Sequence, residues 1–144
     1  MRNPNKYVHF EYANLSIGQS AELTKKISQK DIERFAEISG DKNPIHLDDE
    51  YAKNSIFGKK VAHGLLAVSM ISTILGTKLP GPGSIYLKQE VKFLKPVFPG
   101  DTITAKVTVT KKFEEKKRVE LSTSCSNQNN ETVLDGTSLV QVER

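Results

Sequence analysis

A carboxylate and an imidazole lie five positions apart in the segment 39–48, which reads SGDKNPIHLD. Asp41 and His46 are side chains that can accept and release protons, and an unperturbed imidazole titrates at pH ~6.5, close to neutrality. Between them, Pro44 lacks a backbone N–H and restricts Asn43 to extended conformations. We therefore expect a fixed, non-helical turn that holds an acid/base pair around one water molecule or one substrate proton.

Each of these residues also has an ordinary structural explanation. Aspartate after glycine is common in turns, so Asp41 taken alone indicates only a turn, and His46 taken alone indicates a histidine in a surface loop. Their joint occurrence with Asn43 and with the later pair His63-Gly64 favours a functional site. His63 by itself is equally compatible with a structural role and with a functional one.

Other chemistries fit the sequence less well. A metal site built from Asp41, His46 and Asp48 lacks the accompanying cluster of histidines or cysteines, so we predict no metal. No Gly-x-Ser-x-Gly segment is present, which argues against a serine hydrolase. The single cysteine, Cys125, falls in an alternating strand pattern and is expected to be a buried small residue rather than a nucleophile.

Three helical patterns surround the segment 39–48. Ser28, followed by Asp31 three positions later, resembles a capping box and predicts a helix that ends at Gly40. A short helix is expected through residue 54, capped by Asp48 or Asp49. The segment 61–77 is apolar almost all round, which predicts a longer helix that is buried on most sides.

The rest of the chain alternates between apolar and polar residues, as strands do. A weak strand is expected at 21–27, and four stronger ones at 85–93, 103–109, 119–125 and 133–142. Short polar turns between these runs indicate an antiparallel meander, and an apolar helix requires such a sheet to curve around it. We predict one α+β domain over residues 1–144, with residues 1–19 as a loosely held arm.

Composition narrows the function classes without choosing among them. The 144 residues carry a net charge of +4, which is compatible with nucleic-acid binding, with a pocket for a phosphate-bearing ligand, or with a solvated basic surface. The lysines are spread along the chain and no aromatic RNA-binding motif is present, so no nucleic-acid partner is predicted. No signal peptide or membrane-spanning stretch is visible, and the lone cysteine weakly favours a reducing, cytoplasmic location.

Residues 35–46, with Ala52 six positions later, resemble the signature of the (R)-specific enoyl-CoA hydratases of the MaoC-like, hot-dog-fold group. Three weaker segments follow in the order that this family shows: residues 61–65, 83–87 and 96–101. Together the resemblance covers roughly residues 20–142. It implies a hot-dog fold, in which an antiparallel β-sheet wraps around a long central α-helix, and a homodimer with the active site near the interface.

The same resemblance implies syn hydration of trans-2-enoyl-CoA to (R)-3-hydroxyacyl-CoA, with coenzyme A as part of the substrate and no metal or redox cofactor. By this analogy Asp41 and His46 hold one water, although the sequence does not say which of them is the base. Gly64 is expected to offer a backbone N–H to the thioester oxygen near a helix N-terminus. His63 would line the entrance and Asn43 would brace the loop. The acyl tail would pass three residues, Ser72, Leu75 and Val140.

Two rival functions remain open. A 3-hydroxyacyl-[acyl carrier protein] dehydratase would use the same two residues on a protein-borne acyl chain. A non-catalytic subunit that binds acyl thioesters would share the fold, but it has no need of Asp41 and His46. The pathway is also open between polyhydroxyalkanoate precursor supply, β-oxidation and fatty-acid synthesis.

Overall fold

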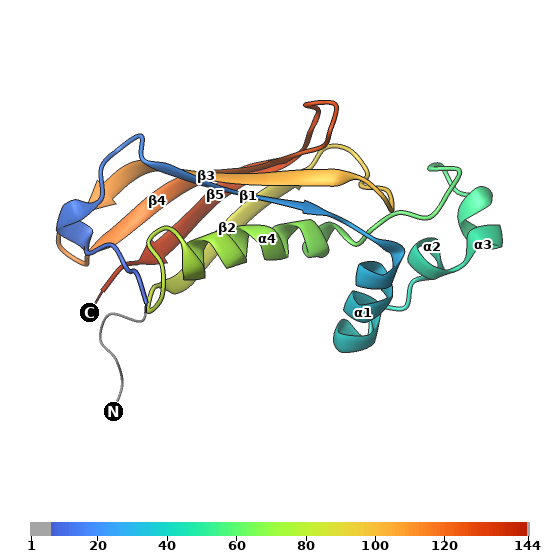
Figure 1. Ribbon diagram of the computed structural model, residues 1–144, viewed down its shortest axis with the longest axis horizontal. Coiled ribbons are helices and arrows are strands. Elements are labelled where there is room, and N and C mark those ends of the chain that lie inside the picture. The colour runs from blue at the N-terminus through green and yellow to red at the C-terminus, as the bar shows by residue number, and fades with distance from the viewer. Residues whose placement is uncertain (1–6, 144) are drawn as a thin grey trace.

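A five-stranded antiparallel sheet and one long helix, α4 (Gly64–Thr77), form the body of the chain (Figure 1). The structure is a computed structural model and describes residues 7–143. The strand order is β1-β3-β4-β5-β2, so β1 and β2 are the edges. The strands are β1 (Ser20–Lys26), β2 (Ile85–Phe93), β3 (Thr102–Phe113), β4 (Arg118–Ser126) and β5 (Thr132–Gln141).

Three further helices lie together beyond one end of the sheet (Figure 1). They are α1 (Gln29–Ser39), α2 (Pro44–Leu47) and α3 (Asp49–Lys53). The predicted capping box at α1 is confirmed, because Ser28 Oγ accepts from the N–H of Asp31 at 3.0 Å and the Asp31 carboxylate accepts from the N–H of Ser28 at 3.0 Å. Asp48 caps α3 by accepting from the N–H of Tyr51.

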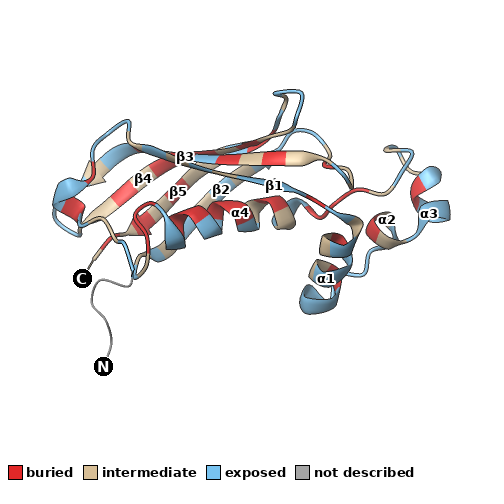
Figure 2. Cartoon of the chain, viewed as in Figure 1, coloured by how far each residue is buried: buried red, intermediate tan, exposed pale blue. Residues whose placement is uncertain are grey.

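Helix α4 differs from its prediction in two respects. It begins at Gly64 rather than at Val61, because the N–H of Val61 bonds to Ile45 O at 3.2 Å and that of Ala62 bonds to Val97 O at 2.7 Å. It is also buried on one side only, since the sheet covers one face and leaves Ser69, Ser72 and Thr73 exposed (Figure 2).

The core lies between that face of α4 and the sheet. Alternate residues of β3 and β4 are buried, as the period-2 pattern predicted, among them Val107, Val109 and Leu121. Ile71 and Ile74 of α4 meet them from the other side and are fully buried. The α+β prediction is therefore confirmed, with β3 continuing four residues past its predicted end at 109.

The prediction of a loose arm over residues 1–19 is wrong from residue 10 onward; residues 1–6 lie outside the described part of the chain. Tyr12 and Leu15 are 3% and 2% exposed, and residues 12–14 form a 3₁₀ helix. The N–H of Phe10 bonds to Pro80 O, and Lys112 Nζ donates to Leu15 O at 2.6 Å. Apolar side chains in a polar stretch explain the difference, because their burial stabilises the segment.

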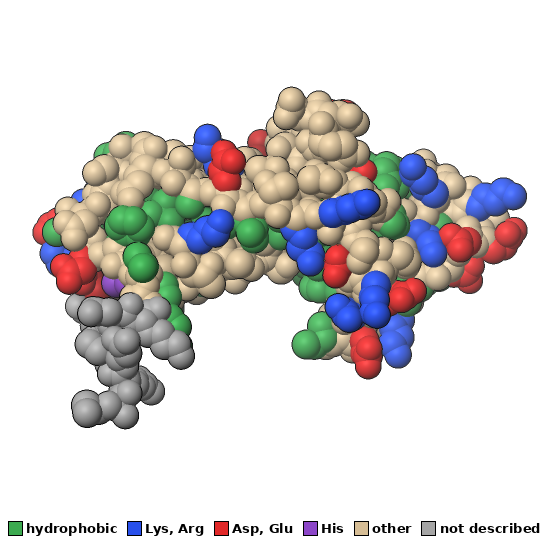
Figure 3. Space-filling view, in the orientation of Figure 1, with side chains coloured by type: hydrophobic (Ala, Val, Ile, Leu, Met, Phe, Trp, Pro, Cys, Tyr) green, Lys and Arg blue, Asp and Glu red, His purple; other side chains and the backbone are tan. Residues whose placement is uncertain are grey.

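Charges of both signs alternate over the surface. On the face seen in Figure 3, basic and acidic side chains are interspersed, most densely around α1 to α3. Ion pairs join Lys60 to Asp49 at 3.3 Å and Lys95 to Glu131. Within residues 7–143 no helix is long and apolar enough to cross a membrane.

Candidate active site

The segment between α1 and α3 is partly helical, which corrects the expectation of a wholly irregular turn. Gly40 adopts a left-handed conformation, with φ of 78°, and ends α1. Pro44 then opens the four-residue helix α2, with Asn43 as its N-cap. Proline is favourable at the first helical position because the N–H that it lacks has no helical partner there. The Asn43 side chain accepts from the N–H of Ile45 at 3.1 Å, so it fixes the start of α2.

Asp41 lies in the exposed loop between these two helices. Its N–H donates to Ser39 Oγ at 3.1 Å, and its carboxylate accepts from the N–H of Asn43 at 3.2 Å. The other carboxylate oxygen has no partner among the described residues. Local backbone contacts thus fix the position of the Asp41 side chain.

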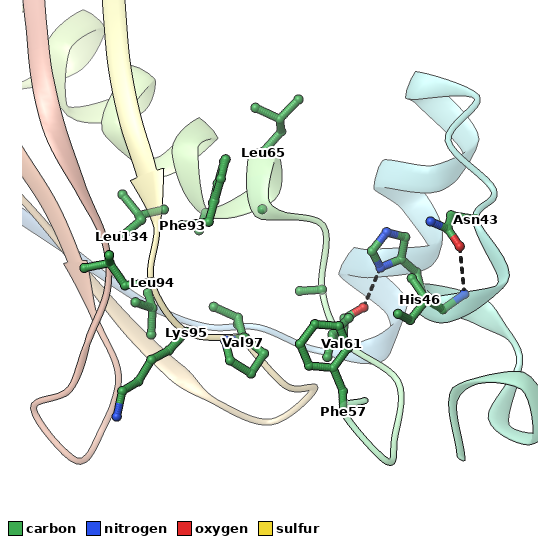
Figure 4. A pocket seen from close by; sticks show the side chains of 16 residues that line it. Asn43, His46, Phe57, Val61, Leu65, Phe93, Leu94, Lys95, Val97 and Leu134 are labelled. Atoms are coloured by element: carbon green, nitrogen blue, oxygen red, sulfur yellow. Dashed lines mark hydrogen bonds between the residues drawn. The ribbon is translucent and has the colours of Figure 1, made fainter. Parts of the chain in front are cut away.

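His46 sits on α2 and is 8% exposed. Its Nδ1 lies 2.7 Å from Val61 O (Figure 4). A carbonyl oxygen can only accept, so Nδ1 carries a proton, and in the neutral form of the ring the lone pair is on Nε2. This hydrogen bond therefore selects the tautomer in which Nε2 can act as a base.

His63 joins these residues to the start of α4. Its ring stacks on the ring of His46, with centroids 3.7 Å apart and an interplanar angle of 28°. His63 Nε2 lies 3.0 Å from Asp41 O, to which it donates, and Phe35 packs against the ring at a centroid distance of 4.7 Å. Its Nδ1 is buried and has no partner in the described part of the chain.

One donor atom from each of Asp41, His46 and His63 lies within 4.8 Å of the other two. This group offers the atoms that a divalent cation could use. One nitrogen of each ring is bonded to a carbonyl oxygen, which leaves His46 Nε2 and His63 Nδ1 without a partner among the described residues. His46 Nε2 and the Asp41 carboxylate are also the atoms that could hold a hydrogen-bonded water molecule.

Gly64 is the first residue of α4, and no side chain caps that end of the helix. The first N–H groups of a helix have no intrahelical partner and carry the positive end of its dipole. A Cβ built on Gly64 would lie 2.5 Å from Cε1 of Phe93. The absence of a side chain therefore lets the Phe93 ring lie directly against this helix end.

A cavity of about 440 Å³ lies beside His46 and the start of α4 (Figure 4). Asn43, His46 and Gly64 line it, as do residues that the sequence did not single out, namely Phe57, Leu65, Phe93, Leu94, Lys95 and Leu134. Asp41 and His63 are not part of the lining, although their side chains lie close to His46. Leu75 and Val140 are buried in the core, and Ser72 is exposed on α4, so none of the three borders this cavity.

Known proteins resemble this chain over most of its length. The MaoC-like domain matches residues 13–130. An (R)-specific enoyl-CoA hydratase of Rhodospirillum rubrum is 46% identical over 91% of this chain and 90% of its own. A 3-hydroxybutyryl-CoA dehydratase of Methylorubrum extorquens is 43% identical over 96% and 87%. The solved structure of an R-hydratase from Pseudomonas aeruginosa is 40% identical, with a TM-score of 0.88 over 94% of this chain and 87% of that one, and the predicted hot-dog architecture is thereby confirmed.

Proposed function

The chain belongs to the family of MaoC-like domains, and on that premise we propose that it is an (R)-specific enoyl-CoA hydratase. It is a hydro-lyase that adds water to trans-2-enoyl-CoA to give (R)-3-hydroxyacyl-CoA, and it runs the reverse dehydration as well. The observation that carries the proposal is the placement of His46 at a largely apolar cavity that the open N-terminus of α4 also lines, with the Asp41 carboxylate within 4.8 Å of the His46 ring.

In this reaction Asp41 and His46 hold one water molecule. His46 Nε2 takes a proton from the water while the oxygen forms a bond to C3 and the C2=C3 π electrons move toward the thioester. Asp41 accepts a hydrogen bond from the same water and orients it. The proton on His46 is then delivered to C2 on the same face, which regenerates the neutral ring and completes syn addition.

Negative charge builds on the thioester oxygen during this addition. The N–H of Gly64 is the donor we assign to it, because it is the first N–H of α4 and carries the favourable end of the helix dipole. Asn43 supports the loop and His63 supports the pair of reacting residues. Neither a metal ion nor a redox cofactor takes part in these steps.

The acyl tail is proposed to continue past the first turn of α4 toward Ser72, Leu75 and Val140. This path requires Leu75 and Val140, which are buried in the single chain, to become accessible to the tail. A homodimer is proposed to complete it. Strand β2 is an open edge and exposes Ile85 and Leu87 at 50% and 42%, so pairing through this edge would cover apolar surface.

The test is the loss of absorbance of the conjugated thioester when the purified protein meets crotonyl-CoA. A stereospecific 3-hydroxyacyl-CoA dehydrogenase then reads the handedness of the product. Rapid loss that yields the (R) product, abolished in Asp41→Ala and in His46→Ala, is the expected result. Asp49→Ala is the matched control, because this exposed acid of α3 lies outside the cavity lining. No turnover of crotonyl-CoA or of a longer enoyl-CoA would contradict the assignment.

Coenzyme A is preferred to acyl carrier protein as the thioester carrier, because the two relatives compared above are named for CoA substrates. Rates on matched CoA and carrier-protein thioesters separate these alternatives. A cytoplasmic location, no nucleic-acid partner and a role in fatty-acid or polyhydroxyalkanoate metabolism belong to the same proposal.

A further inference from the structure

We propose that Phe93 determines which acyl groups the site accepts, by filling the space beside C2 of the thioester and thereby excluding substrates that are branched at that carbon. The inference rests on the proposed hydratase function and adds a specificity-determining residue to it. It concerns a side chain on strand β2, remote in sequence from Asp41 and His46.

Phe93 is the last residue of the edge strand β2, and its Cα is paired with that of Leu134 on β5. Its ring points toward the helix side of the sheet and reaches the first turn of α4, where Figure 4 shows it beside Leu65 and Leu134. The side chain is 54% exposed in the single chain and lines the cavity, so it is not part of the core. A large aromatic residue in this position lies where a ligand can meet it.

Phe93 lies so close to Gly64 that a side chain at position 64 would collide with the Phe93 ring. A Cβ at Gly64 would lie 2.5, 2.8 and 3.1 Å from three atoms of the Phe93 ring, which is well inside van der Waals separation. Because both residues also line the cavity, the ring forms one wall of the space directly in front of the helix N-terminus.

A thioester oxygen that accepts from the N–H of Gly64 lies at about 2.9 Å from that nitrogen. C1 and C2 are then held against Gly64, on the side that the ring borders. A straight trans-enoyl chain is flat at C2 and C3 and carries only a hydrogen atom on the edge of C2 that faces the ring. A methyl group on the sp² carbon C2 lies in the same plane and widens that edge, so it needs volume that the ring occupies.

The size of the discrimination follows from the volume of one methyl group. One carbon too many in an apolar pocket typically changes kcat/KM by about 10- to 200-fold. We therefore expect the wild-type protein to prefer crotonyl-CoA over trans-2-methylbut-2-enoyl-CoA by a factor in this range, and Phe93→Ala to raise the ratio of branched to straight kcat/KM by at least about tenfold.

Leu94 provides a matched control, because it follows Phe93 in the chain, lines the same cavity and is similarly exposed, at 50%. None of the atoms of Leu94 is among the three that lie nearest to a Cβ built on Gly64. Leu94→Ala should leave the ratio within about twofold of the wild-type value, which is far smaller than the roughly 10- to 200-fold effect of one carbon in an apolar pocket. Phe93→Leu, which keeps an apolar side chain of smaller width, should give an intermediate ratio and serves if Phe93→Ala fails to fold.

An unchanged ratio in folded Phe93→Ala or Phe93→Leu would overturn the inference, and so would an equal shift in Leu94→Ala. Activity of the wild-type protein on crotonyl-CoA, measured in the same experiment, separates the two proposals. If the wild-type protein hydrates crotonyl-CoA and the ratio does not move, only the role of Phe93 falls. If it hydrates neither thioester, the proposed function falls and the role of Phe93 falls with it.

Discussion

Replacing His46 with asparagine separates the chemistry of the imidazole from its packing. The ring is 8% exposed and donates through Nδ1 to Val61 O at 2.7 Å. In asparagine the amide nitrogen is bonded to Cγ, as Nδ1 is in histidine, so it can keep this donor. Nothing in asparagine replaces Nε2, the atom to which we assign the proton transfer.

The expected magnitudes differ for rate and for stability. Loss of a positioned general base lowers kcat by about 10²- to 10⁴-fold, which corresponds to about 3–5 kcal/mol of activation free energy. The free energy of unfolding should fall by only about 0.5–1.5 kcal/mol in His46→Asn, the worth of the lost stacking on His63. In His46→Ala, Val61 O also loses its donor, which costs about 1–3 kcal/mol more.

The assay combines crotonyl-CoA turnover with urea denaturation of both variants. We expect equally low activity in the two proteins, together with a clearly higher denaturation midpoint for His46→Asn than for His46→Ala. Activity of His46→Asn within tenfold of wild type would refute the assignment of Nε2 as the base. Equal midpoints in the two variants would show instead that the bond to Val61 O does not stabilise the fold.

Three further predictions concern stability and reactivity. A Cβ at Gly136 would lie 1.8 Å from the backbone oxygen of Glu90, so Gly136→Ala must push β2 away from β5. We expect the free energy of unfolding, measured in urea, to fall by at least about 1–3 kcal/mol. An unaltered denaturation midpoint would count against this. Burial raises the pKa of the Cys125 thiol to about 12, so at about pH 8 a disulfide reagent should modify the folded protein far more slowly than the urea-unfolded chain, and comparable rates would be inconsistent with that burial. Ser28→Ala removes half of the capping box with Asp31 and should cost about 1 kcal/mol in thermal denaturation, with Ser28→Thr as the control that retains the cap.

Local sequence signals predicted the regular elements well. Helix α1 followed from the side chains of Ser28 and Asp31, which satisfy each other's backbone N–H groups within one turn of chain. The strands followed from alternation, because a sheet with one buried face fixes which residues face the core. Both signals depend on neighbours in sequence, and the structure confirms both.

The wrong predictions concern segments whose backbone partners are distant. Nothing within residues 61–63 reveals that the N–H groups of Val61 and Ala62 bond to Ile45 and Val97 rather than to a helix. The helix at Pro44 differs from the expected non-helical turn for another reason, since proline disrupts the interior of a helix but favours a helix at its first position.

The candidate site likewise contains residues that local sequence signals predicted and residues that they did not. The spacing of Asp41 and His46 predicted a pair of reacting residues, and the structure brings them together with His63. The cavity wall at Phe93 could not be predicted, because Phe93 follows the alternation of its strand like any core residue. Only the register between β2 and β5, and the missing side chain at Gly64, place it at the site.

The groups assigned to proton transfer and to charge stabilisation all come from residues 41–64, a short stretch tied to itself through Val61 and Ile45. The ring proposed to lie beside C2 of the acyl group belongs instead to Phe93 of β2, outside that stretch. Sequence change in the strands can therefore alter what is accepted while the reacting groups keep their arrangement. A related protein could therefore acquire new substrates and keep the same reaction. Exchanging β2 between relatives would use this separation to change substrate preference.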